Sequence, residues 1–246
     1  MKFYNRENEL AELQRIQELS FGENSRLTVV TGRRRIGKTS LIMRAFEKTS
    51  TIYLFVGRKN EASLCWEFIT LVSQALDIYV PEEISTFKSL FRYIMEAATR
   101  QSFNLVIDEF QEFYNINKSI YSDIQDIWDQ YRQKTHMNFV VSGSIYSLME
   151  KIFHNEKEPL FGRADNIIKL SAFSLNVLKK IMKDYHPQYT NDDLLALYSF
   201  SGGVPKYVEL FCDNRVLTVD EMIDFMVRDN SPFTDEGKNL LIEEFG

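Results

Sequence analysis

A phosphate-binding loop is the feature that most constrains this sequence. Residues 32–39 read Gly-Arg-Arg-Arg-Ile-Gly-Lys-Thr and match the pattern G-x-x-x-x-G-K-[ST]. The apolar run 27–31 predicts a strand before the loop, and apolar residues at helical spacing, beginning with Leu41 and Ile42, predict a helix after it. Because the pattern stands in this context, the sequence predicts that the chain binds a nucleoside triphosphate here.

Each part of the loop has an expected role. Gly32 and Gly37 allow the tight turn that points backbone N–H groups at phosphates, and the following helix adds partial positive charge. Lys38 is expected to reach the β- and γ-phosphates, and the hydroxyl of Thr39 is expected to bind Mg²⁺. The full predicted nucleotide-binding segment is Gly32, Arg33, Arg34, Arg35, Ile36, Gly37, Lys38, Thr39 and Ser40.

The three arginines inside the loop have two interpretations. Side chains at these variable positions mostly project away from the phosphates, so at least two of Arg33, Arg34 and Arg35 are expected to be solvated or ion-paired. The alternative is that one of them contacts a partner, a neighbouring subunit or the γ-phosphate.

Two adjacent carboxylates complete the predicted site. The apolar run 103–108 predicts a strand that ends in Asp108, and Glu109 follows it. Asp108 suits indirect coordination of Mg²⁺, and Glu109 is placed to polarise an attacking water. The interval between the loop and this acid pair leaves room for an additional strand between them in the sheet, as in ATPases with a catalytic glutamate.

Three further positions are candidates with structural alternatives. Ser142, at the end of the apolar run 138–142, could contact the γ-phosphate or the water, and is weakly preferred over Ser144; both serines could equally belong to a helix-capping turn. Arg163 precedes the last predicted strand, where we expect the sheet edge that carries the phosphate chemistry. It could act as an arginine finger, in cis or across a subunit interface, or be an exposed loop arginine.

The hydrophobic pattern predicts an α/β fold with a second, helical part. Continuous apolar runs separated by helices predict a parallel sheet covered on both faces. The predicted strands are 27–31, 52–56, 103–108, 138–142 and 167–170, and the predicted C-terminal helices are 174–185, 191–200, 205–213, 218–228 and 234–245. We therefore expect a core domain over residues 1–172 and a smaller α-helical lid domain over residues 173–246. The last residues are still apolar, so we expect further domains beyond them.

Composition limits the partners. The net charge of −6 argues against a broad duplex-binding face. The two cysteines, Cys65 and Cys212, are expected to be buried reduced thiols, and no leader or membrane-spanning run is visible, so we expect a cytoplasmic protein without membrane contact.

Six segments taken together make the chain resemble the prokaryotic AAA-type ATPase family first recognised in archaea, which is related to the STAND and origin-recognition ATPases. They are Phe3-x-Asn5-Arg6-Glu7-x-Glu9-Leu10, the loop 32–39, Ile107-Asp108-Glu109-Phe110-Gln111, Ser142-Gly143-Ser144, Pro159-Leu160-Phe161-Gly162-Arg163 and Gly202-Gly203-Val204-Pro205. The resemblance spans nearly the whole chain, in the expected order.

The resemblance implies a P-loop core with a five-stranded sheet and a helical lid, with ATP and Mg²⁺ as cofactors and a nucleotide-driven conformational switch. It also implies that Arg6 and Glu7 lie near the adenine and that Arg163 senses the phosphate. Pro205, in the turn before a predicted helix, is expected to help hold the helical part over the base. Family members usually continue into a winged helix and a nuclease-like domain, so any nucleic-acid role would belong to parts outside this chain.

Two functions stay open. The first is Mg²⁺-dependent ATP hydrolysis in which Glu109 activates water. The second is an ATP-gated interaction module with little turnover. A small-molecule kinase is disfavoured because no second substrate site is visible, and ATP is favoured over GTP because no NKxD motif occurs. Self-association and an effector domain stay open as partners besides ATP and ADP.

Overall fold

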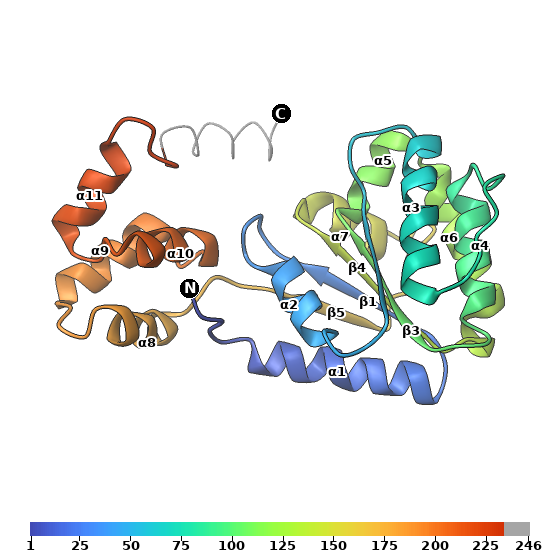
Figure 1. Ribbon diagram of the computed structural model, residues 1–246, viewed down its shortest axis with the longest axis horizontal. Helices are drawn as coiled ribbons and strands as arrows, with labels where there is room; N and C mark the ends of the chain where they lie inside the picture. The colour runs from blue at the N-terminus through green and yellow to red at the C-terminus, as the bar shows by residue number, and fades with distance from the viewer. Residues whose placement is uncertain (234–246) are drawn as a thin grey trace. The chain divides into compact units, whose positions relative to one another are not determined.

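The structure, a computed structural model, describes residues 1–233 and divides into two compact units (Figure 1). The core unit comprises Glu7–Arg33 and Lys38–Leu170, and the helical unit comprises Met1–Arg6, Arg34–Gly37 and, within the described chain, residues 171–233. This division differs in three places from the expected boundary after residue 172, because the first six residues, four residues of the phosphate-binding loop and residues 171–172 group with the helices.

The core unit contains a five-stranded sheet in which every pair of neighbouring strands is parallel. Its spatial order is β2-β3-β4-β1-β5. The strands are β1 (Arg26–Thr31), β2 (Thr51–Phe55), β3 (Phe103–Asp108), β4 (Met137–Gly143) and β5 (Asn166–Lys169). The predicted α/β fold with five parallel strands is confirmed, as is the extra strand, β4, between the strands that carry the loop and the acid pair.

The strand order decides which helices cover which face of the sheet. The connection from β1 to β2 runs in one direction across the sheet, and the connections to β3, β4 and β5 run in the other. Because such crossovers are right-handed, the first connection and the later ones lie on opposite faces. Figure 1 shows α2 beside α1 on one side, away from α3, α4 and α6. The longer helices of the core unit are α1 (Glu7–Gly22), α2 (Lys38–Ala45), α3 (Glu61–Leu76), α4 (Phe87–Ala97), α6 (Ser119–Tyr131) and α7 (Tyr146–His154).

Aromatic side chains fill the space between the sheet and the helices. Phe139 on β4 lies 5.5 Å from Phe91 on α4 and 5.6 Å from Trp128 on α6, measured between ring centroids. All three side chains are fully buried. Aromatic pairs at such distances add about 0.5–1.5 kcal/mol each beyond their burial, so the central strands form a well-packed support for the loops at their ends.

A buried polar cluster joins α1 to the amino-terminal half of the sheet. Gln17 Nε2 donates to Thr49 Oγ1 at 2.8 Å and to Asn104 Oδ1 at 2.7 Å. Asn138 Nδ2 donates to the same Asn104 oxygen at 2.9 Å. Asn104 and Asn138 stand near the starts of β3 and β4, so this cluster lies at the opposite end of the strands from their carboxyl termini and serves the fold.

The helical unit is built from α8 (Leu175–Tyr185), α9 (Asn191–Ser201), α10 (Pro205–Asn214) and α11 (Val219–Val227). Capping boxes start α9, at Thr190 and Asp193, and α11, at Thr218 and Glu221; each satisfies two otherwise unpaired backbone donors. The N-terminal segment joins this unit, since the Tyr4 hydroxyl donates to Asp184 at 2.6 Å. The helix predicted at 234–245 lies outside the described residues.

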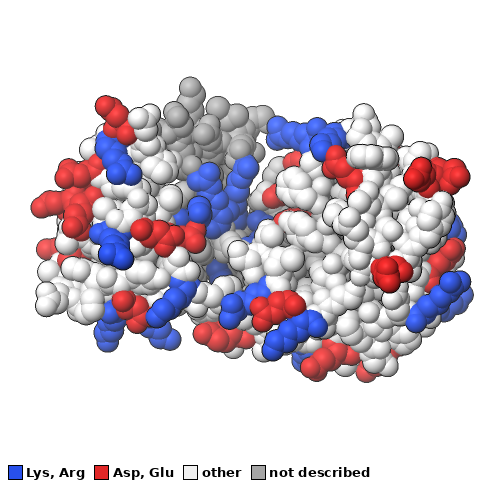
Figure 2. Space-filling model, viewed as in Figure 1, with Lys and Arg blue, Asp and Glu red and all other residues white. Residues whose placement is uncertain are grey.

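Charged side chains of both signs are mixed over the visible face of the core unit, and acidic ones gather at the edge of the helical unit where α11 lies (Figure 2). Both cysteines are free and buried, as predicted. No helix within residues 1–233 is long and apolar enough to cross a membrane.

Candidate active site

The phosphate-binding loop leaves β1 at a point where the chain connections diverge. The segment after β1 leads to α2 on one face of the sheet, and the segment after its neighbour β4 leads to α7 on the other. In parallel α/β sheets such a divergence opens a crevice at the carboxyl ends of the strands, where ligands bind. Thr31 of β1 pairs with Gly143 of β4, so the loop and the 142–144 segment meet at this edge.

Two backbone conformations shape the loop. Arg35 has φ of 66° and Gly37 has φ of 91°. Both values are positive, and residues other than glycine rarely adopt a positive φ. A side chain at Gly37 would meet nothing within 4 Å, so glycine is required there by its backbone and not by lack of space. Alternating backbone conformations of this kind turn successive N–H groups toward one point, which is how a chain builds an anion site.

Lys38 is buried, with 6% of its surface exposed, and its ammonium group lies against the loop. Nζ donates to the carbonyl of Gly32 at 2.9 Å and to that of Arg33 at 3.4 Å. A phosphate oxygen in place of one of these neutral acceptors would pair the ammonium group with an anion, which adds the attraction of opposite charges to the hydrogen bond. The side chain is therefore placed and charged to bind an anion held in the loop.

Asp108 accepts four hydrogen bonds and is the best-anchored group of the site. Its Oδ2 accepts from Thr39 Oγ1 and from the Tyr53 hydroxyl, each at 2.7 Å. Its Oδ1 accepts from the Ser142 hydroxyl and from the backbone N–H of Glu109. Burial raises the pKa of Asp108, but the hydrogen bonds from Ser142, Thr39 and Tyr53 outweigh it and hold the pKa below its ordinary value. The group is a carboxylate at neutral pH.

These contacts indicate how Mg²⁺ would be held. A carboxylate has about four acceptor positions, so Asp108 is already saturated and would reach a metal ion through an intervening group. The hydroxyl of Thr39 donates its hydrogen bond to Asp108, so the lone pairs of its oxygen can bind a cation. Mg²⁺ keeps several waters and takes phosphate oxygens as ligands, and no cluster of three or more His, Cys, Asp or Glu within the described chain competes as a metal site. Thr39 and Asp108 therefore fit a bound Mg²⁺ ion.

Glu109 is held quite differently. Its backbone is left-handed, with φ of 54° and ψ of 42°, directly after β3. One carboxylate oxygen, Oε2, accepts from Ser144 Oγ at 2.8 Å and from Gln111 Nε2 at 2.5 Å. Strained backbone in a non-glycine residue persists where surrounding contacts fix it, typically at functional positions. Adjacent acids on one strand end thus have different partners.

The two serines near the end of β4 have different partners, and the preference for Ser142 over Ser144 at the nucleotide stays a prediction. The Ser142 hydroxyl is fully buried and donates to Asp108, so it helps to fix that carboxylate. Ser144 is half-buried and contacts Glu109. The two serines lie two residues apart, on either side of Gly143 at the end of β4. Because the chain changes direction there, each serine contacts a different acid.

The structure corrects the expected place of Arg163. β5 is parallel to β1, with Asn166 opposite Thr28, so a residue before β5 lies at the amino-terminal edge of the sheet. The guanidinium group of Arg163 donates to Asp129 on α6 at 3.0 Å and to the carbonyl of Phe161 at 2.9 Å. Arg163 is therefore at the edge of the sheet opposite the phosphate-binding loop, and a role as an arginine finger stays a prediction.

The remaining predicted residues belong largely to the helical unit. Arg6 is 5% exposed and donates from Nη2 to the carbonyl of Ser171 at 2.5 Å, and its guanidinium group lies 5.7 Å from the ring centroid of Phe173. Pro205 is the first residue of α10. Contact of Arg6 and Pro205 with a nucleotide stays a prediction.

The loop arginines have exposed side chains, as does Ser40, whereas Ile36 is buried. Arg35 has a partner in the helical unit: its guanidinium group lies 5.7 Å from the ring centroid of Tyr207, and its carbonyl accepts from the N–H of Lys206 at 3.4 Å. The contact joins the middle of the loop to α10.

Sequence reasoning missed Tyr53 and assigned no role to Gln111. Tyr53 lies on β2, whose residues alternate between buried and partly exposed, so a half-buried aromatic looked like ordinary sheet packing. Tyr53 lies two residues before the end of β2, and Phe55, the last residue of that strand, is the one that pairs with Asp108. Only the length of the tyrosine side chain brings its hydroxyl to the carboxylate.

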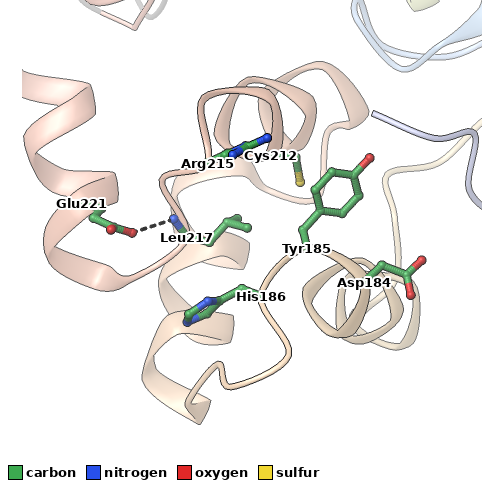
Figure 3. Close-up of a pocket in the computed structure, with 7 residues that line it drawn as sticks. All are labelled: Asp184, Tyr185, His186, Cys212, Arg215, Leu217 and Glu221. Atoms are coloured by element: carbon green, nitrogen blue, oxygen red, sulfur yellow. Dashed lines mark hydrogen bonds between the residues drawn. The ribbon is translucent and has the colours of Figure 1, made fainter.

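A cavity of about 440 Å³ opens in the helical unit (Figure 3). It is lined by Asp184, Tyr185, His186, Cys212, Arg215, Leu217 and Glu221. Its acids are already engaged, since Glu221 accepts from the N–H groups of Leu217 and Thr218 and Asp184 accepts from Tyr4. Burial raises the pKa of Cys212 to about 12, so its thiol is protonated at neutral pH. The lining therefore offers no group comparable to the acids that follow β3.

The arrangement of strands and acids defines the class of the protein. A strand inserted between the one that carries the phosphate-binding loop and the one that carries the acid pair is typical of AAA-like P-loop ATPases. Residues 3–211 match the family described as ATPase domains predominantly from Archaea, and the chain belongs to that family.

One curated relative is similar along most of this chain. An uncharacterised protein of Methanocaldococcus jannaschii is 25% identical over 232 residues, which are 92% of this chain and 49% of the relative. The chain thus spans about half the length of that curated relative.

Three solved structures share the fold. A Walker-type ATPase of Pyrococcus abyssi has a TM-score of 0.64 and 17% identity, covering 98% of this chain and 72% of its own. The ORC2 protein of Aeropyrum pernix, solved as ADPNP–ADP complexes, has a TM-score of 0.63 and 15% identity, covering 100% and 69%. A STAND protein of Pyrococcus horikoshii with a tetratricopeptide repeat sensor has a TM-score of 0.59 and 15% identity, covering 98% and 32%.

Proposed function

We propose that this chain binds ATP with Mg²⁺ at residues 32–39 and hydrolyses the nucleotide, with Glu109 as the general base. The observation that carries the proposal is the contrast between the two acids after β3. Asp108 accepts hydrogen bonds on both oxygens and has no capacity left for a proton-transfer role. Glu109 is held through one oxygen only by the described residues.

The residues divide the work between binding and chemistry. Backbone N–H groups of the loop and the ammonium of Lys38 hold the phosphates, and Thr39, oriented by Asp108, presents its oxygen to the metal. Mg²⁺, when bound, neutralises charge that develops on the phosphate oxygens. The second oxygen of Glu109 then accepts a proton from the water that attacks the γ-phosphate.

Substitution of the base separates binding from turnover. Glu109→Gln should keep ATP affinity and lose turnover by about 100-fold or more, the usual contribution of a general base. Glu112→Gln is the matched control, since Glu112 lies three residues further along the same turn and bonds to Asn115. Lys38→Ala should lose both affinity and turnover. Hydrolysis at the parent rate by Glu109→Gln would refute the assignment of the base.

The proposal includes a conformational switch, supported by how the loop divides between the units. Gly32 and Arg33 group with the core unit, Arg34–Gly37 with the helical unit, and Lys38 with the core again. Nucleotide that reshapes the loop therefore acts on a segment belonging to both units. Hydrogen exchange at α10 should change on addition of a slowly hydrolysed ATP analogue, and Arg35→Ala should reduce that change while leaving analogue binding within about threefold. An unchanged response in Arg35→Ala would contradict this route.

An ATP-gated interaction module with little turnover is the second candidate. It is favoured by large apolar side chains on the helical unit, where Leu195 on α9 is 63% exposed and Val227 on α11 is 75% exposed. Exposed apolar side chains that gather into a patch mark protein-contact surfaces. Equilibrium binding compared with steady-state phosphate release separates the candidates: tight binding with negligible release favours the module, and absence of both refutes each of them.

A further inference from the structure

Gln111 is a buried side chain that the two-acid mechanism leaves unexplained. It lies in the short 3-10 helix η1 (Phe110–Glu112) directly after the acid pair, and none of its surface is exposed. Buried glutamines are costly unless all of their amide atoms find partners. This one therefore needs a reason.

The amide nitrogen of Gln111 contacts the base. Its Nε2 donates to Glu109 Oε2 at 2.5 Å, and Ser144 Oγ donates to the same oxygen at 2.8 Å. Two donors that converge on one carboxylate oxygen fix the rotation of the group. The other oxygen, Oε1, accepts no hydrogen bond from the described residues and is the one left to accept a proton.

The amide oxygen of Gln111 has no hydrogen-bond partner among the described residues, although it is buried. It lies over Gly143, where a Cβ atom would come within 2.5 Å of it. The backbone of Gln111 is held from α6, since the Tyr121 hydroxyl donates to its carbonyl at 3.3 Å. An apolar residue of the same size would avoid the unsatisfied oxygen, so stability does not account for a glutamine at this position.

We propose that Gln111 is a positioning residue, which holds Glu109 by one oxygen so that the other faces the water attacking the γ-phosphate. This rests on the proposed hydrolysis by Glu109. The interaction acts through Glu109 and touches neither nucleotide nor metal, so it affects the rate of the chemical step and not the binding of ATP. Ser144, which directly follows β4, contributes the second hydrogen bond to the same oxygen.

The test is Gln111→Met, which keeps the length of the side chain and removes both amide atoms. The kcat for ATP hydrolysis should fall by about 10-fold or more, the effect of losing one well-aligned contact in the transition state, while the Kd for ATP stays within about twofold. Gln17→Met is the matched control: Gln17 is also buried and hydrogen-bonded, but it lies in the polar cluster at the amino-terminal half of the sheet. It should keep the parent kcat once both variants are shown to be folded by thermal unfolding.

A double-mutant cycle tests the route of the effect. Because Gln111 and Ser144 donate to one oxygen, the loss of kcat in Gln111→Met with Ser144→Ala should differ from the product of the two single losses.

The outcomes separate this inference from the proposed function. If Glu109→Gln loses turnover while Gln111→Met keeps the parent kcat, the role of Gln111 is refuted and the base stands. A rise in Kd that matches the whole loss of activity in Gln111→Met would show a structural effect and also refute it. If the parent chain does not hydrolyse ATP, both proposals fall.

Discussion

The hydrogen bond from Tyr53 to Asp108 gives a prediction with a magnitude. Tyr53→Phe removes one of the four donors to a carboxylate that is 4% exposed, while the ring stays in place and no cavity forms. A hydrogen bond to a charged group contributes about 1.5–3 kcal/mol. The free energy of unfolding of the core unit should therefore fall by about 1.5–3 kcal/mol at pH 7.

The loss should depend on pH in a stated direction. Burial raises the pKa of Asp108, but the hydrogen bonds of Ser142, Thr39 and Tyr53 lower it more, so the folded pKa lies below the ordinary 3.8. A carboxyl with a lowered folded pKa contributes stability that is fully present above the unfolded pKa and is lost as the pH falls through the folded one. Below that point the tyrosine meets a neutral acid, and the cost of Tyr53→Phe should shrink toward about 0.5–1.5 kcal/mol.

Tryptophan fluorescence in urea titrations measures this unit, because both tryptophans, Trp66 and Trp128, lie in it and Trp128 is fully buried. Tyr121→Phe is the control, since its hydroxyl donates to two neutral backbone carbonyls at 3.2 and 3.3 Å. Its cost should not change between pH 7 and the acid range. A cost for Tyr53→Phe that is as independent of pH as that of Tyr121→Phe would refute the argument that Asp108 is a saturated carboxylate.

Two further predictions follow from backbone geometry and topology. Gly203→Ala should lower the thermal stability of the helical unit more than Gly202→Ala, because both have positive φ but only at Gly203 would a Cβ meet backbone, the carbonyl oxygen of Phe173 at 2.5 Å; the strain alone costs about 1–3 kcal/mol, and equal melting temperatures would contradict the clash. Arg163→Ala should cost less than about 1 kcal/mol, since it removes a partly exposed ion pair with Asp129. At low protein concentration, the turnover of the Arg163→Ala variant should equal that of the parent. A loss of turnover that does not depend on protein concentration would show that Arg163 acts within its own chain.

The acid pair illustrates what could be read from the sequence and what could not. Asp108 and Glu109 were identified because a buried strand and its final residues are contiguous in the chain. Their different roles became visible only with their partners, and Asp108 is bound by Thr39 and Ser142 from 69 and 34 residues away. No local pattern encodes such distances.

The position of Arg163 shows what a local sequence pattern leaves undetermined. The strand after it was predicted within one residue of its observed bounds, but its direction in the sheet is a tertiary property. Because β5 pairs parallel with β1, a residue that precedes β5 must lie at the edge away from the loop. The pattern alone does not reveal which end of a strand faces the site.

The sequence by itself determined the phosphate-binding loop, the five strands and the acid pair, because each depends on spacing along a short segment or on a continuous run of apolar residues. The tertiary structure decided which donors hold which acid, that four loop residues group with the helical unit, and that Gln111 is buried against Glu109. These features depend on side chains that converge from separate strands and helices, and the packing of the sheet brings them together.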